Sequence, residues 1–272
     1  MKRKENYRPR SIGRIFTVTF ITLILIMAIA IGYPVFTNWY MSVRRATNEL
    51  AGTLNYRTNE KIDSYIHAPL NINEVNYRML QDGMVNLSDE KERNSFFFFF
   101  FSANKEDIYS FSYCTADGDY YGAIYNKDGM IEMIKNLEET NRETRYFPVN
   151  DDMTTGVYKE STGKTDPRLS DWYHAAAIAK TAVFSPVYKC SLLNEMAISA
   201  VYPIYTENGT LKGVLASRLL LPDISDTLSE IVRNYGGAVA IVEKSSGNLI
   251  ANSAGIANYA LSDDGKLIRK SL

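Results

Sequence analysis

The segment IYSFSYCTADGDYYGAIYN, residues 108–126, decides the fold of this chain. Two runs rich in Tyr, Phe and Ile, which favour extended strands, flank the turn residues Asp117, Gly118 and Asp119. An Asp-Gly turn between two such runs predicts a β-hairpin. Because side chains alternate along a strand, we expect Tyr120 and Tyr121 on opposite faces, so that at most one of them reaches a given pocket.

More strand-like runs follow towards the C-terminus, namely VFSPVYKC at 183–190, MAISAVYPIY at 196–205 and LKGVLASRLLL at 211–221. Before them the sequence predicts a helix over 130–141, a polar loop over 155–167 and a short helix over 171–180. Asp171 is the expected N-cap of the short helix. Five antiparallel strands with a central helical insertion predict an α+β module of the PAS type.

A second module of this type begins after a connecting helix that is predicted over 223–232. The segment GGAVAIVEKSSGNLIANS at 236–253 predicts another hairpin, which turns at Ser246 and Gly247. The residues that follow are too few to complete a packed domain of this kind. We therefore expect the chain to stop partway through the second module.

The N-terminal part predicts one membrane-spanning helix. No charged residue occurs from Ile15 to Val43, and the apolar centre IFTVTFITLILIMAIAIGYPVF covers residues 15–36. About 20 residues of helix cross a hydrocarbon core of about 30 Å, so the stretch is long enough. The competing interpretation is a cleaved signal peptide, but the apolar run is longer than the roughly 7–15 residues of such a signal. We expect a retained anchor.

The side of the membrane follows from the charges before the anchor. Residues 1–14 contain six basic side chains against one acidic side chain, which favours a cytoplasmic N-terminus and places the rest of the chain outside the cytoplasm. A long helix is predicted over 38–68, continuing over 71–84 after a break near Pro69. Two interpretations stay open for this helix: it packs on its own domain, or it forms a homodimer with a second copy.

These predictions divide the chain into five parts: a cytoplasmic basic tail at 1–14, a transmembrane helix at 15–36, a long helical region at 37–106, a membrane-distal module at 107–222, and a linker helix with an incomplete second module at 223–272. The six consecutive phenylalanines at 96–101 are too few to cross a membrane. They form a buried helix end, a contact with the sheet or a dimer partner, or an exposed patch, and the sequence does not choose between these.

The composition excludes several classes of protein. Lys plus Arg total 30 and Asp plus Glu total 31, so the net charge of −1 argues against a nucleic-acid binder. Two histidines and the two cysteines, Cys114 and Cys190, are too few for a zinc site of the usual kind, and we expect no metal and no cofactor. The strands of the two cysteines are not expected to be neighbours, so no disulfide is predicted.

No catalytic motif stands out either. STGKT at 161–165 imitates a phosphate-binding loop, but it lacks the first glycine of that pattern and runs into Pro167 rather than a helix. No serine has the surroundings of a hydrolase nucleophile, and no carboxylate pair is singled out for general acid–base chemistry. The chain is therefore not expected to be an enzyme.

The ordered set of DPRLSDWY at 166–173, Ala176 and Tyr188 resembles the ligand-pocket signature of the extracytoplasmic double Cache sensor domains of bacterial signal-transduction receptors. Further matches are DGDYYGAIYN at 117–126, NGTLKGVLASRLLL at 208–221 and PDISDTLSEIV at 222–232, and the resemblance covers about residues 38–260. It implies a membrane-distal module that binds a small molecule beneath its sheet. A membrane-proximal module would pass the signal towards a cytoplasmic output such as a histidine kinase, a diguanylate cyclase or a chemoreceptor signalling domain.

The resemblance also implies the candidate ligand-binding residues Arg168, Asp171, Trp172, Tyr173 and Tyr188. In the amino-acid-binding subset of the family, an arginine stands two residues before the Trp-Tyr pair and an acidic residue stands two residues after the strand tyrosine. Ser170 and Cys190 occupy these places here. Both ends of an amino acid thus lack the expected charged partner. We expect an organic acid or another small polar metabolite instead.

Two classes of function are therefore compared. The leading hypothesis is the small-molecule sensor region of a membrane signal-transduction protein. The alternative is a membrane-anchored structural or interaction module that uses the same fold without a ligand, or a truncated receptor. An interior filled by Trp172, Tyr173 and Tyr188 packed on each other would favour the alternative, and a cavity surrounded by them would favour the sensor.

Overall fold

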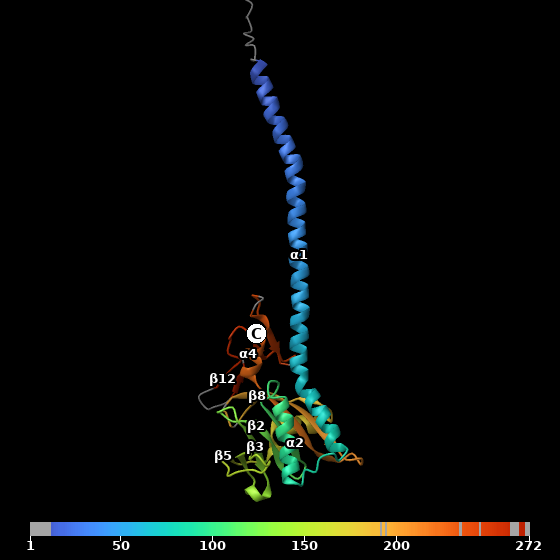
Figure 1. The fold of residues 1–272 in the computed structure, drawn as a ribbon, viewed down its shortest axis with the longest axis vertical. Coiled ribbons are helices and arrows are strands. Elements are labelled where there is room, and N and C mark those ends of the chain that lie inside the picture. The colour runs from blue at the N-terminus through green and yellow to red at the C-terminus, as the bar shows by residue number, and fades with distance from the viewer. Residues whose placement is uncertain are drawn as a thin grey trace, which may run out of the picture. The chain divides into compact units, whose positions relative to one another are not determined.

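The computed structural model describes residues 12–190, 192–193, 195–233, 236–244, 246–261 and 267–269. The chain forms two compact units, residues 1–57 and residues 58–272 (Figure 1). Helix α1 (Ile12–Gln81) contributes to both units. The class is α+β, as the sequence predicts, because four α-helices occur together with an antiparallel sheet of nine strands in the described part of the chain.

The first unit contains the apolar part of α1. By length and composition this helix is able to cross a membrane, and its apolar side chains are exposed. The hydroxyl groups of Thr17, Thr19 and Thr22 each donate a hydrogen bond of 2.8–2.9 Å to the carbonyl four residues earlier. These bonds satisfy the hydroxyl groups inside the helix, as an apolar environment requires.

The C-terminal part of α1 belongs to the second unit and does not break near Pro69, so that expectation is wrong. The helix runs on to Gln81, and Figure 1 shows it bending in its last turns. Proline lacks the backbone N–H and crowds the preceding turn, and bending is the usual way in which a helix accommodates it. Six side chains of this stretch are buried: Thr58, Pro69, Ile72, Asn73, Asn76 and Leu80.

The sheet of the second unit has the order β5-β4-β3-β2-β1-β9-β8-β6, with β7 also paired to β8, and all its pairs are antiparallel. The predicted hairpin is confirmed, since Tyr113 lies opposite Tyr121 in the β1–β2 pair. The strands are β1 (Ser110–Thr115), β2 (Tyr120–Tyr125), β3 (Ile131–Asn136), β4 (Glu143–Pro148), β5 (Glu160–Lys164), β6 (Val183–Phe184), β7 (Tyr188–Lys189), β8 (Met196–Tyr205) and β9 (Leu211–Leu220).

Along the chain, α2 (Glu90–Ala103) precedes the strands of this unit, α3 (Asp171–Ala179) lies between strands, and α4 (Leu221–Val232) follows the large sheet. The 3-10 turns are η1 (Glu138–Thr140) and η2 (Pro167–Leu169). After α4, β10 (Ala240–Val242) pairs with β11 (Leu249–Asn252), which confirms the second predicted hairpin. Another short pair follows, formed by β12 (Tyr259–Leu261) and β13 (Leu267–Arg269).

The sheet has nine strands instead of the five expected, because residues 130–167, for which no strand was predicted, form β3, β4 and β5, and because one predicted strand divides into two. Residues 130–141 form β3 and a 3-10 turn rather than a helix. Met133 packs against the α2 side of the sheet, and Ile134 packs on the opposite side, which is the alternation of a strand. The polar segment 155–167 contributes β5, which pairs with β4 at the edge of the sheet. The run 183–190 divides into β6 and β7.

Two apolar clusters occupy the two faces of the sheet. The larger one holds Phe111, Tyr113 and Leu215 together with side chains of α1 and α2. The other one holds Cys114, Val214 and Trp172, which is the side of α3. Strands β1, β2, β3 and β9 contribute to both clusters by alternation, so neighbouring residues in these strands lie on opposite faces of the sheet.

The phenylalanine run is a helix that packs on the sheet. Asp89 caps α2 by accepting a hydrogen bond of 2.9 Å from the backbone N–H of Glu92, and Figure 1 shows α2 lying over β2 and β3. Phe96, Phe97 and Phe101 are buried, whereas Phe99 is 58% exposed. The buried phenylalanines of the run therefore contact the sheet, which is one of the three alternatives that the sequence leaves open.

Candidate ligand-binding cavity

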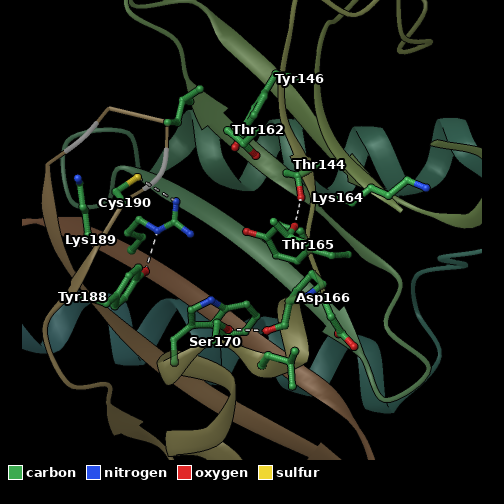
Figure 2. A pocket seen from close by; sticks show the side chains of 16 residues that line it. Thr144, Tyr146, Thr162, Lys164, Thr165, Asp166, Ser170, Tyr188, Lys189 and Cys190 are labelled. Atoms are coloured by element: carbon green, nitrogen blue, oxygen red, sulfur yellow. Dashed lines mark hydrogen bonds between the residues drawn. The ribbon is translucent and has the colours of Figure 1, made fainter. Parts of the chain in front are cut away.

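A cavity of about 500 Å³ lies on the α3 side of the sheet (Figure 2). Its walls come from strands β2, β4, β5, β7 and β9, from the segment around η2, and from the first turn of α3. The volume is in the range of small-molecule sites, and the lining mixes aromatic, hydroxyl and charged groups. The charged side chains among the described lining residues are Lys164, Asp166, Lys189 and Arg218.

Arg218 is the central charged group of the cavity. It lies in β9, where its strand neighbour Ser217 is on the α1 face and hydrogen-bonds to Asn73. The Arg218 Nε donates a hydrogen bond of 2.8 Å to the hydroxyl oxygen of Tyr188, and Nη1 lies 3.6 Å from the sulfur of Cys190 (Figure 2). The guanidinium is thus oriented by two residues that themselves line the cavity.

Tyr188 extends this arrangement into the sheet. Its hydroxyl lies 2.6 Å from the hydroxyl of Ser199 in β8. Either hydroxyl can be the donor in this hydrogen bond, while the Tyr188 oxygen also accepts from Arg218. The backbone N–H of Ser199 in turn donates to Ser185 at 3.0 Å. The orientation of the guanidinium therefore rests on a chain of hydrogen bonds in the sheet rather than on one flexible contact.

The positive charges of the cavity have no acidic partner of their own. In the described part of the chain, none of Arg218, Lys164 and Lys189 forms an ion pair. The two lysines are exposed, whereas Arg218 is half-buried. A desolvated charge without a counter-ion is unfavourable, so the cavity has an electrostatic preference for negative charge.

Asp166 is already neutralised from outside the cavity. Its two carboxylate oxygens accept hydrogen bonds of 2.9 and 2.8 Å from Nε and Nη2 of Arg168, which also donates to the carbonyl of Ala116 at 3.0 Å. These hydrogen bonds from Arg168 hold the pKa of the Asp166 carboxyl below its usual value. Asp166 is therefore ionised and paired, and its charge is not free to hold a ligand.

Aromatic rings form the apolar part of the wall. The rings of Tyr120 and Trp172 lie 5.9 Å apart, and Tyr146 lies in strand β4, which β3 separates from the strand of Tyr120. Burial raises the pKa values of Tyr120 and Tyr146 above that of an exposed tyrosine, so both hydroxyls are neutral. Such rings offer flat apolar faces with neutral polar edges to a ligand.

The two cysteines are free, as predicted from their strand positions. Cys114 is completely buried, and burial raises the pKa of its thiol to about 12. Cys190 follows β7 and lines the cavity. The position at which the amino-acid-binding subset of the family carries an acid thus holds a cysteine next to Arg218.

Of the five ligand-binding residues predicted from the sequence, two line the cavity and three do not. Trp172 and Tyr188 line the cavity, but Arg168, Asp171 and Tyr173 do not. Arg168 is bound to Asp166, and Asp171 is an exposed residue in the first turn of α3. The N-cap of α3 is Ser170 and not Asp171, which corrects the prediction.

Tyr173 lies on the buried side of α3, with its ring 5.9 Å from that of Trp172. The expectation for the tyrosine pair in β2 is met, because Tyr120 lines this cavity and Tyr121 packs in the cluster on the opposite face.

Arg218 was missed by the sequence analysis. The signal was present in LKGVLASRLLL, where one arginine interrupts an otherwise apolar strand. A charged residue in the middle of a buried strand needs a partner or a function. Arg218 belongs to the segment that resembles the double Cache family, but the candidate residues came from the segment around Trp172. No group of metal-ligating side chains occurs among the residues that the structure describes.

No protein-family model matches this chain, and no curated protein matches it. Among solved structures, it is similar to the ligand-binding domain of the Pseudomonas aeruginosa amino acid chemoreceptor PctC in complex with GABA, with 17% identity over 76% of this chain and 77% of that chain, and a TM-score of 0.48. It is also similar to that of PctB of the same organism in complex with L-Arg, with 14% identity over 82% and 74% of the two chains, and a TM-score of 0.49.

A third similar structure is the ligand-binding domain of the Campylobacter jejuni chemoreceptor Tlp3 in complex with L-valine, with 15% identity over 76% of this chain and 74% of that chain, and a TM-score of 0.44. All three are ligand-binding domains of chemoreceptors. At these low identities, the ligands named for them are properties of those proteins and not of this chain.

Proposed function

We propose that this chain is the extracytoplasmic sensor region of a single-pass membrane signalling protein, and that a small molecule binds in the cavity beside Arg218. The observation that carries the proposal is the cavity itself. Trp172 and Tyr188 surround a space of about 500 Å³ instead of filling it, and hydroxyl and charged groups face that space. This supports the sensor over an anchored module without a ligand.

The membrane part of the proposal rests on the first unit. Residues 15–43 of α1 carry no charge, and the basic residues precede this stretch, so we place the N-terminus in the cytoplasm. Residues 107–222 would then be the membrane-distal module, and 223–272 would contain the linker helix and part of a second module. A homodimer through α1 belongs to the proposal as well, because the side chains of residues 37–57 are almost all exposed.

The sheet offers a route from the cavity to α1. Ser217 and Arg218 are neighbours in β9, and they serve opposite faces of the sheet. On the α1 face, the Ser217 hydroxyl donates a hydrogen bond of 2.7 Å to the Asn73 Oδ1, and the Asn73 Nδ2 donates one of 2.8 Å to the carbonyl of Ala200 in β8. A ligand that shifts β9 would therefore change contacts of the helix, which is what a population shift between two signalling states requires.

A ligand screen with a blocked cavity tests the proposal. The full chain in detergent micelles is screened for thermal stabilisation by organic acids, amino acids, sugars and nucleosides. A compound at about 100 times its Kd is expected to add about 2.7 kcal/mol and to raise the Tm by several degrees.

The cavity is blocked by Thr162→Phe in β5, because Thr162 lines it. Ser161→Phe is the matched control, since Ser161 is exposed and not in the lining. Stabilisation should disappear in Thr162→Phe and persist in Ser161→Phe. A folded chain that no compound stabilises, or hits that both variants retain, would reject the proposal.

A further inference from the structure

Arg218 has unused hydrogen-bonding capacity directed at the cavity. A guanidinium carries five N–H donors in a planar fork. Two of its nitrogens have partners, Nε with the Tyr188 hydroxyl and Nη1 with the Cys190 sulfur at 3.6 Å, which is a weak acceptor. The described part of the chain provides no acceptor for Nη2. Because Arg218 lines the cavity, a bound molecule is the natural partner for this side of the fork.

The charge balance of the cavity favours a ligand with negative charge. Three cationic side chains and one carboxylate line it in the described part of the chain, and the carboxylate of Asp166 is held by Arg168. The ligand thus meets uncompensated positive charge at Arg218 and exposed positive charge at Lys164 and Lys189. A planar carboxylate accepts two parallel hydrogen bonds from a guanidinium, which makes it the best geometric match.

The same balance argues against a ligand that carries an ammonium group. An α-ammonium group is held most strongly by an acceptor with negative charge, and the only acidic side chain among the described lining residues is engaged by Arg168 at 2.8 and 2.9 Å. A buried ammonium group beside Arg218 would meet like charge. The aromatic faces of Tyr120 and Trp172 instead favour an apolar or aromatic body.

We propose that the cavity binds an organic carboxylate without an amino group, and that Arg218 holds the carboxylate while the rings of Tyr120 and Trp172 contact the body of the molecule. This inference names the ligand class and depends on the proposed function, since it uses the same cavity. It assigns the role of anchor to a residue of β9 rather than to Arg168.

Matched compounds test the ligand class through the fluorescence of Trp172. The chain has two tryptophans, so Trp39→Phe leaves Trp172 as the only one, and it lines the cavity. The full-length Trp39→Phe chain in detergent micelles is titrated with three sets: 3-phenylpropanoate, its amide and L-phenylalanine; 4-methylpentanoate, its amide and L-leucine; butanedioate, its diamide and L-aspartate. At least one carboxylate is expected to bind ten times or more tightly than its amide and its amino acid.

Variants of Arg218 test the anchor. Arg218→Gln should weaken the best carboxylate at least about tenfold and leave weak amide binding unchanged, because a charge-assisted bond is lost. Arg218→Lys should recover part of the affinity. Lys212→Gln in the same strand is the control for a lost positive charge, because Lys212 is exposed and outside this cavity, and it should bind normally. If Arg218→Gln does not fold, the affinity of Arg218→Lys for the best carboxylate is compared with that of Lys212→Gln, and it should be the lower of the two.

The outcomes separate the two proposals. If amides or amino acids bind as tightly as the carboxylates, or if Arg218→Gln and Arg218→Lys both bind the best carboxylate like the unchanged protein, the inference is wrong and the sensor function stands. If none of the nine compounds changes the fluorescence of Trp172 while another compound of the screen stabilises the chain through the cavity, the inference is wrong as well. If no compound of either experiment binds, the proposed function fails and the inference fails with it.

Discussion

Two free cysteines give a residue-scale probe of the cavity. Cys190 lines the cavity beside Arg218 and is 2% exposed, whereas Cys114, in the cluster on the same face of the sheet, does not line the cavity and is completely buried, and burial raises its pKa to about 12. Only the thiolate reacts with alkylating reagents. At pH 8 we expect iodoacetamide to modify Cys190 in the native full chain and to leave Cys114 intact until the protein is unfolded.

Peptide mass spectrometry measures both sites in the same sample. Cys190→Ser is the control, because its native form should take up no label. The cavity assignment would be contradicted if Cys114 were modified as fast as Cys190. A ligand from the screen should slow the modification of Cys190.

Buried tyrosine and cysteine side chains predict a loss of stability in alkaline solution. The pKa of Tyr121 is raised to about 12, and so is that of Cys114, in both cases mainly by burial. In the unfolded chain these groups lose their protons near pH 10 and near pH 8.5. Between about pH 9 and pH 12 the unfolded state therefore binds fewer protons than the folded state, and the free energy of unfolding falls as the pH rises.

The Tm of the full chain in micelles, measured from pH 7 to pH 11, checks this prediction. The Tm should change little up to pH 8 and fall with increasing slope above pH 9. Tyr121→Phe removes one of the titrating groups, so its decline should be shallower. A Tm that is constant up to pH 11 would show that these side chains are not buried as described.

At the residue scale, the sequence indicates the site only in part. Trp172 and Tyr188 come from a local motif, and both line the cavity. Arg168 comes from the same motif, but its partner Asp166 is two residues away and holds it. Arg218 is 30 positions from Tyr188 and meets it only because β7 and β9 both pair with β8. Contacts that depend on the order of strands cannot be inferred from spacing along the chain.

Helix α2 gives the first prediction at the scale of elements. Phe97 is completely buried and its ring lies 5.4 Å from that of Phe111, whereas Phe99 two positions later is 58% exposed. Phe97→Ala should lower the free energy of unfolding by about 3–5 kcal/mol, because it removes a core ring and leaves a cavity. Phe99→Ala should change it by less than about 0.5 kcal/mol.

The Tm values of the two variants in micelles make the comparison. A similar effect of both substitutions would contradict the packing of α2 on the sheet. It would favour instead a run of phenylalanines that is covered equally on all sides, as in a dimer contact.

The junction between α1 and the sheet gives the second prediction. Asn73 is completely buried, and it bonds both to Ser217 in β9 and to Ala200 in β8. Asn73→Ala should lower the free energy of unfolding by about 2–3 kcal/mol, because the Ser217 hydroxyl and the Ala200 carbonyl lose their hydrogen-bond partner. It should also reduce any response of α1 to a ligand.

Asn71→Ala in the same helix is the matched control, since Asn71 is exposed. The Tm of both variants and the mobility of a spin label on an exposed residue of α1, measured with and without the best screening compound, test the two parts. A ligand response of α1 that is unchanged in Asn73→Ala would rule out this route.

Helices and strands were predicted well where a local sequence pattern determines them, and less well where pairing with a distant strand determines the secondary structure. The β1–β2 hairpin and strands β8 and β9 follow from alternation and turn residues, whereas helices α3 and α4 were predicted with the wrong caps, since their N-caps are Ser170 and Leu220. The segment 130–141 has a composition that suits either a helix or a strand, and its pairing with β2 and β4 makes it β3. Strand β5 is polar because it is an edge strand beside the cavity, and its composition therefore looks like that of a loop.

At the scale of the whole molecule, the first unit supplies an apolar helix and the second unit supplies a sheet with a cavity on one face. The opposite face of the sheet contacts the C-terminal part of α1 through Ile72, Asn73 and Leu80. A sensor needs these three features together: an anchor, a binding site, and an element that contacts the site's scaffold and continues towards the membrane segment. The central claim is that a small molecule occupies this cavity.

An experimental structure of the full chain with the tightest-binding compound of the screen tests that claim most directly. The account predicts one molecule per chain in the cavity, in contact with Trp172 and within hydrogen-bond distance of the Arg218 guanidinium. A compound bound elsewhere, or a cavity closed by the rings of Trp172 and Tyr188 packed on each other, would contradict it.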